Sequence, residues 1–170
     1  MNTEIIYYSS PIGMLEIRKA GDAISHILFV NSWKGAKVNE HEIAIKSPES
    51  IVIQNCIKEL DEYFAGNRFT FTVKVNQPGT GFRQNVWTAL CNIPYGKTIS
   101  YLTLSKQIGN VKAIRAVGTA NGNNNICIIV PCHRVIGSNG DLIGYGGELW
   151  RKKWLLDHEA KFGNGVQSLF

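Results

Sequence analysis

The chain has 170 residues, 44% of them hydrophobic, and a formal net charge of +5, which suits one large globular domain or two small ones. No apolar run approaches the roughly 20 residues that span a bilayer, and the start MNTEIIYYSS lacks the features of a signal peptide, so we expect a cytoplasmic protein without a membrane partner. The four cysteines form no C-x-x-C pair, which predicts reduced thiols and neither a metal site nor a disulfide framework.

The first half of the chain reads as a small α/β domain. TEIIYYSS, MLEIRKA and AISHILFV are β-rich runs separated by the turn signals PIG and AGD, which predicts a three-stranded meander. A loop over residues 33–46 and a helix follow. A last strand over residues 68–75 then leads into NQPGTG, the best candidate linker, so we assign this domain to residues 1–76 and the second domain to residues 77–170.

The helix of the first domain has clear end signals. Ser47 is expected as N-cap, Pro48 at the first helical position and Gly66 as the stop. Its apolar residues recur at helical spacing and predict the core face: Ile53, Ile57, Leu60 and Phe64.

The second half is basic and mainly helical. Residues 79–170 hold ten Lys and Arg against four Asp and Glu, whereas residues 1–78 hold eight against nine. This asymmetry favours a nucleic acid as partner, although a merely solvated basic surface has the same composition. TGFRQNVWTALCNIPYG predicts a first helix in which Phe82, Val86 and Leu90 lie four apart and Cys91 is a packed structural thiol.

The next segment has the proportions of a helix-turn-helix. A short helix is expected over residues 102–108, a turn at Gly109 and a second helix over residues 111–120. In the second helix Val111, Ile114 and Val117 predict a core face. A separate face carries Lys112, Arg115 and Thr119, and a narrow side carries Ala113, Ala116 and Ala120. An ordinary surface helix with two solvated cations is the alternative.

Cys132, in IVPCHRVIG, differs from the other cysteines. It follows Pro131, which ends the predicted strand over residues 126–130, and it adjoins His133 and Arg134. Either neighbour favours the thiolate over the thiol, whose ordinary pKa is about 8.5. A glycine-rich loop, GSNGDLIGYGGE, comes next. The residues therefore indicate a nucleophile, with a buried structural thiol as the alternative.

A candidate acid lies in ELWRKKWLLDHEA, which is helical in pattern. His158 and Glu159 fall on the face that carries its apolar residues. A carboxylate on a buried face needs a partner, and we expect Glu159 to pair with His133, as the orienting acid of a base that serves Cys132. The alternative is that Glu159 ends the helix at an exposed edge.

IVPCHRVIG, with RAVGTANG upstream and GYGGELWRKKWLLDHEA downstream, strongly resembles the O6-alkylguanine-DNA alkyltransferases. These motifs cover about residues 79–160. The resemblance implies a ribonuclease H-like N-terminal domain and a mainly α C-terminal domain with a winged-helix-like helix-turn-helix. It implies a one-use repair protein, a monomer without cofactor or metal. Such a protein moves an alkyl group from O6 of guanine in double-stranded DNA, and in some cases from O4 of thymine, onto its own cysteine. It binds through the minor groove with little sequence preference.

Residue by residue, the resemblance makes Cys132 the acceptor, His133 its base acting through a water, Glu159 the residue that orients His133, and Asn124 the residue that ties the preceding turn. The base pocket would comprise Tyr101, Val135, Tyr145, Gly146 and Lys152. Arg115 would enter the duplex, beside a binding face of Lys112, Ala116, Thr119 and Ala120. Two other classes remain open from the residues themselves, a non-catalytic helix-turn-helix binder and a cysteine hydrolase.

Overall fold

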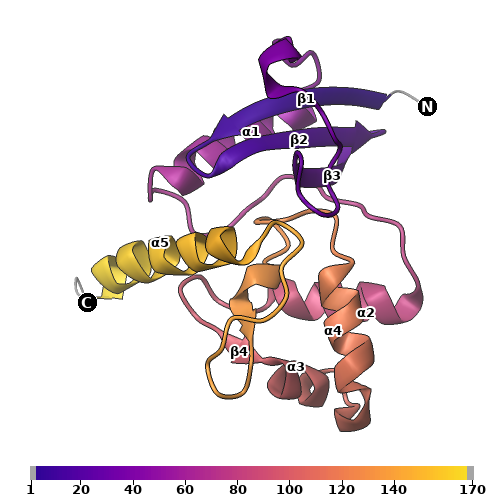
Figure 1. Cartoon of the computed structure of the whole chain (residues 1–170), viewed down its shortest axis with the longest axis vertical. Coiled ribbons are helices and arrows are strands. Elements are labelled where there is room, and N and C mark those ends of the chain that lie inside the picture. Colours follow the sequence, from indigo (N-terminus) through magenta and orange to yellow (C-terminus); the bar gives the residue numbers. More distant parts are fainter. Residues whose placement is uncertain (1–2, 168–170) are drawn as a thin grey trace. The chain divides into compact units, whose positions relative to one another are not determined.

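The protein is described by a computed structural model over residues 3–167 and forms two compact units, Met1–Gln77 and Pro78–Phe170 (Figure 1). Within the described residues, no helix has the length and apolar character needed to cross a membrane.

The first unit contains the predicted meander. The strands β1 (Thr3–Ser10), β2 (Gly13–Ala20) and β3 (Ala23–Phe29) form an antiparallel sheet in the order β1-β2-β3. Ile6 pairs with Ile17, and Leu15 with Phe29, and all four side chains are buried. Alternation of apolar residues therefore places one face of the sheet in the core.

The helix α1 (Ile51–Phe64) buries Ile53, Cys56, Leu60 and Tyr63 and has contacts with all three strands. The prediction that Ser47 caps it was wrong, because the N-cap position is Ser50. The carboxylate of Glu4 accepts hydrogen bonds from the backbone N–H groups of Glu49 and Ser50, at 2.7 and 3.2 Å. This strand residue holds the chain in an extended path until the helix begins.

The predicted stop at Gly66 is confirmed, since this residue has a φ of +81° directly after the helix. Its N–H donates to the Tyr63 carbonyl and that of Asn67 to Glu62. Glycine suits this position because it adopts a positive φ without strain.

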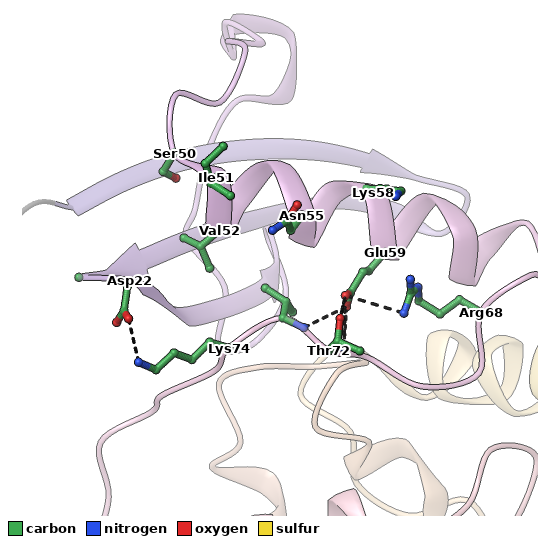
Figure 2. Close-up of a pocket in the computed structure, with 12 residues that line it drawn as sticks. Asp22, Ser50, Ile51, Val52, Asn55, Lys58, Glu59, Arg68, Thr72 and Lys74 are labelled. Atoms are coloured by element: carbon green, nitrogen blue, oxygen red, sulfur yellow. Dashed lines mark hydrogen bonds and ion pairs between the residues drawn. The ribbon is translucent and has the colours of Figure 1, made fainter.

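The predicted strand over residues 68–75 was wrong. Glu59 of α1 accepts hydrogen bonds from the backbone N–H groups of Thr72 and Val73 and from the Thr72 hydroxyl (Figure 2). A side-chain carboxylate thus takes the donors that a strand ladder would have used. A single parallel bridge joins Ile24 to Val75. Glu59 and this segment line a cleft of about 600 Å³.

The second unit is mainly helical. In chain order its elements are α2 (Gly81–Cys91), β4 (Ile99–Ser100), α3 (Tyr101–Gln107), η2 (Val111–Ala113), α4 (Ile114–Gly122), η3 (Cys132–Arg134), β5 (Val135–Ile136) and α5 (Leu149–Gln167). The first unit adds one short 3-10 turn, η1 (Glu40–Glu42). The core of the second unit buries Val86, Trp87, Leu90, Leu104, Val117 and Leu155. Cys91 ends α2 and is exposed, so the prediction of a packed thiol there was wrong.

The helices α3 and α4 form the predicted helix-turn-helix, with Gly109 at a φ of +83° in the turn. The second helix opens as the 3-10 turn η2 before it becomes α-helical. Val117 is buried, but Val111 and Ile114 are 49% and 39% exposed. The predicted core face is therefore wrong at its first two positions, which project from the core.

Candidate active site

The segment before Cys132 is a buried turn, so the predicted strand over residues 126–130 was wrong. Val130 N–H donates to the Ile126 carbonyl at 3.0 Å, and Ile128 has a φ of +73°, which is strained for a β-branched residue. Asn124 holds the turn from inside. Its Nδ2 donates to the Ile126 and Val130 carbonyls at 3.3 and 2.8 Å, and its Oδ1 accepts from Ile126 N–H at 3.1 Å.

Pro131 then leads into η3, which carries Cys132, His133 and Arg134 on one buried 3-10 turn. Cys132 is 6% exposed, and its N–H donates to the Val130 carbonyl at 2.8 Å. The turn continues into β5, which pairs in parallel with β4. Backbone hydrogen bonds on both sides therefore fix the position of the thiol.

His133 and Glu159 meet as predicted. The distance between His133 Nε2 and Glu159 Oε1 is 2.7 Å, and both side chains are fully buried. The alternative that Glu159 lies at an exposed helix edge was wrong. Burial lowers the pKa of His133, against the opposing effect of the Glu159 carboxylate, so the ring is neutral. A neutral ring that donates from Nε2 to the carboxylate has its lone pair on Nδ1. That atom is buried and has no hydrogen-bond partner among the described residues.

Arg134 completes a charge-balanced set that the sequence reasoning missed. Its Nε and Nη2 donate to the two carboxylate oxygens of Glu159, each at 2.9 Å, and its Nη1 donates to the Ile93 carbonyl at 2.7 Å. Burial alone would raise the pKa of Glu159, but His133 and Arg134 hold it well below its usual range. An arginine directly before Val135 and Ile136, in a segment rich in apolar residues, was a usable signal, because a buried guanidinium requires an acid.

Several predicted base-pocket residues come together beside this set. Lys152 is fully buried, and its Nζ donates to the Val135 and Ile143 carbonyls at 2.7 and 2.8 Å. The Tyr101 hydroxyl donates to the same Ile143 carbonyl at 3.1 Å. These contacts tie the glycine-rich loop to β5 and α3. Tyr145 and Gly146 lie half-buried in that loop.

Burial also changes the acid–base behaviour of this group. It lowers the pKa of Lys152 to about 8, while negative charge at Cys132 opposes the change. Burial and the charge at Cys132 raise the pKa of Tyr101. The pKa values of both side chains therefore depend on whether Cys132 is a thiolate.

The second helix of the helix-turn-helix presents most of the predicted DNA-binding residues. Lys112, Arg115, Ala116 and Thr119 are exposed. Ala120 was a wrong choice, because it is only 2% exposed and its carbonyl accepts a hydrogen bond from Trp87 Nε1 at 2.9 Å. Arg115 and Lys112 therefore lie on an exposed surface whose other predicted binding residues, Ala116 and Thr119, have small side chains.

Comparisons with known proteins agree with this architecture. Residues 5–77 match the ribonuclease-like domain of the 6-O-methylguanine DNA methyltransferases, and residues 81–161 match the DNA binding domain of the same class. The two matches together span most of the chain and separate at the same linker.

Whole-chain relatives carry the same description. Methylated-DNA–protein-cysteine methyltransferases from Methanosarcina acetivorans and Mycobacterium bovis are 45% and 43% identical, covering 90% and 95% of this chain and 96% and 94% of theirs. The crystal structure of the Mycobacterium tuberculosis O6-methylguanine methyltransferase matches with a TM-score of 0.80 at 39% identity, covering 94% of each chain. Another, of the M. tuberculosis OGT in complex with DNA, matches with a TM-score of 0.81 at 40% identity over 93% of each chain. The chain belongs to the methylated-DNA–protein-cysteine methyltransferase family.

Proposed function

We propose that this protein repairs DNA by direct reversal, moving an alkyl group from O6 of guanine onto Cys132 in a single, irreversible turnover. The observation that carries the proposal is the buried contact of 2.7 Å between Glu159 of α5 and His133, which adjoins the cysteine on the same 3-10 turn. It supplies a neutral base whose Nδ1 is available and whose ring is held by an acid. The relatives named for this activity and the DNA-bound structure support the same assignment.

In the proposed step, His133 takes the Cys132 proton through a water, and Glu159 stabilises the imidazolium. The thiolate attacks the alkyl carbon, so an S–C bond forms as the C–O6 bond breaks. The bonding electron pair leaves on O6, and a proton returns to the guanine. The thioether has no hydrolytic route back, which makes the protein a stoichiometric reagent.

Intact-mass measurement tests the function directly. After incubation with a duplex that contains one O6-methylguanine, the protein is expected to gain one methyl group, located by peptide mapping on Cys132 and saturating at one per chain. A protein that binds this duplex without any gain of mass, with bulkier O6-alkyl adducts included, is a damage binder and not an alkyltransferase.

DNA recognition is assigned in this proposal to the second domain, from residue 77 onward, and to the exposed side of α4. Chemistry on O6 requires the base to leave the stack, which costs a few kcal/mol. Arg115 is exposed and can fill the vacated space, as inserted side chains do in minor-groove binders. The four cysteines suit the reducing cytoplasm that we propose as the location.

Replacing Arg115 with alanine is expected to slow transfer from duplex O6-methylguanine about 10- to 100-fold, because the arginine offsets part of the cost of flipping. Reaction with free O6-benzylguanine should change less than about twofold, since no base is flipped. Single-turnover rates on both substrates make the comparison. Lys161→Ala, which removes an exposed cation of α5, is the matched control and should slow neither. Equal slowing of both substrates by Arg115→Ala rules out a role in flipping.

The transfer rate is expected to fall as the pH rises through about 8, where buried Lys152 loses its proton. The neutral amine no longer favours a thiolate at Cys132. The same deprotonation cannot act by unfolding the protein. A lysine with a lowered pKa in the folded state binds fewer protons there than when unfolded, so its contribution to stability increases between about pH 8 and 10.5. Rates measured from pH 6 to 10 should show the falling limb in the wild type and not in Lys152→Met, which should be slower at neutral pH. A falling limb that persists in the variant assigns it to another group.

A further inference from the structure

Asn121 lies in the last turn of α4, and the sequence reasoning gave it no role. It is 4% exposed, and its Nδ2 donates to the Cys132 carbonyl at 3.4 Å. This contact fixes the orientation of the amide, because a carbonyl cannot donate to Oδ1. Oδ1 is buried and has no hydrogen-bond partner among the described residues. The helix that carries Arg115 thus places a hydrogen-bond acceptor without a partner next to Cys132, the residue that receives the alkyl group.

The same amide reaches the base-pocket residue Tyr101. Burial and the charge at Cys132 raise the pKa of Tyr101, and a hydrogen bond with the Asn121 side chain lowers it in part. Tyr101 is also held by the Ile143 carbonyl of the glycine-rich loop. Asn121 therefore belongs to the group of side chains around the thiol.

An unpaired buried acceptor destabilises the folded state, so its presence in a native structure calls for an explanation. A bound group that donates a hydrogen bond to it supplies one. O6-alkylguanine offers only one kind of donor, its exocyclic 2-amino group, because alkylation leaves N1 without a proton and N3 and N7 are acceptors. O4-alkylthymine offers no donor at all.

We propose that Asn121 is a specificity-determining residue, whose Oδ1 accepts a hydrogen bond from the 2-amino group of the flipped O6-alkylguanine. The inference rests on the proposed alkyl transfer and deepens it, because it names the part of the base that is read. A site with a buried acceptor discriminates against substrates that lack the donor, since the acceptor then remains unpaired in the complex. O6-Alkylguanine is thereby preferred over O4-alkylthymine.

The test compares duplexes containing O6-methylguanine with duplexes containing O6-methylhypoxanthine, which differs only by lacking the 2-amino group. Single-turnover transfer to Cys132 is measured by mass for the wild type, Asn121→Leu and Asn121→Ala. Asn123→Leu is the matched control, because it makes the same change two residues away, at the half-buried C-cap of α4. Thermal unfolding and DNA binding are measured for each variant, and Asn121→Ala serves if the leucine variant does not fold.

We expect the wild type and Asn123→Leu to prefer O6-methylguanine by about tenfold or more, and the Asn121 variants to lose at least about two-thirds of that preference. A purely structural bond to the Cys132 carbonyl predicts equal slowing on both duplexes and an unchanged ratio, which overturns the inference. Equal wild-type rates on the two duplexes overturn it without any variant. No transfer by the wild type from either duplex contradicts the proposed function itself, which keeps the two failures distinct.

Discussion

Cys132→Ala is expected to lower the rate of methyl transfer by at least about 10⁴-fold, while the affinity for duplex DNA stays within about threefold of the wild type. The thiol is the only group on η3 that can form the S–C bond, whereas the exposed cations Lys112 of η2 and Arg115 of α4 are untouched by the change. Intact mass after incubation with an O6-methylguanine duplex measures the first effect, and fluorescence anisotropy with unmodified duplex measures the second.

Cys91→Ala is the matched control for this experiment. Cys91 is the exposed cysteine of the chain, so it is the thiol most open to adventitious alkylation. Its replacement should leave transfer unchanged. A methyl group found on Cys91 of the Cys132→Ala protein would contradict the assignment of the acceptor.

Glu159→Gln is expected to slow transfer about 10²- to 10³-fold and to lower the free energy of unfolding by about 3–5 kcal/mol. The glutamine cannot stabilise an imidazolium at His133, and it leaves the Arg134 guanidinium buried without its counter-charge. Urea denaturation measures the stability, and single-turnover mass measurements in buffer without urea give the rate. Asp157→Asn is the control, because its ion pair with Lys153 is exposed and should contribute less than about 1 kcal/mol.

The stability difference between wild type and Glu159→Gln should itself depend on pH. The pKa of Glu159 is lowered in the folded state, so its carboxylate contributes stability above the ordinary carboxyl range and loses it as the pH falls. The gap between the two proteins is therefore expected to narrow below about pH 4. A gap that is constant from pH 7 to pH 3 contradicts the charged pairing.

Local sequence patterns correctly predicted the elements whose backbone hydrogen bonds are made within the element or with a neighbouring strand. The meander follows from alternating apolar residues, and α2, α3 and α4 follow from helical spacing and the Gly109 turn. Three errors share one physical cause. Glu4, Glu59 and Asn124 each take backbone donors with a side chain: Glu4 alters the start of α1, Glu59 replaces the strand before the linker, and Asn124 replaces the strand before Cys132. Neither secondary-structure propensity nor hydrophobic periodicity predicts a hydrogen bond between a side chain and a distant backbone group.

The site could be predicted where its residues are adjacent in sequence, or where a charged side chain on a buried helix face requires an ionic or hydrogen-bonding partner. Cys132 and His133 are neighbours, and an acid on the apolar face of α5 pointed to Glu159. Arg134 was visible but was assigned to the thiol instead of the carboxylate. Asn121 could not be found, because a polar residue at a helix end is common and its buried, unpaired oxygen exists only in three dimensions.

The buried set of His133, Arg134 and Glu159 also limits how this chain can diverge. Changing one member alone leaves an ion or a polar ring uncompensated in the core, so single replacements there cost both stability and activity. Joint replacement by apolar residues avoids that cost and can even stabilise a fold. A descendant that no longer transfers alkyl groups can therefore lose all three residues together and keep the exposed surface of α4. A protein that only binds damaged DNA could evolve from a repairing ancestor in this way.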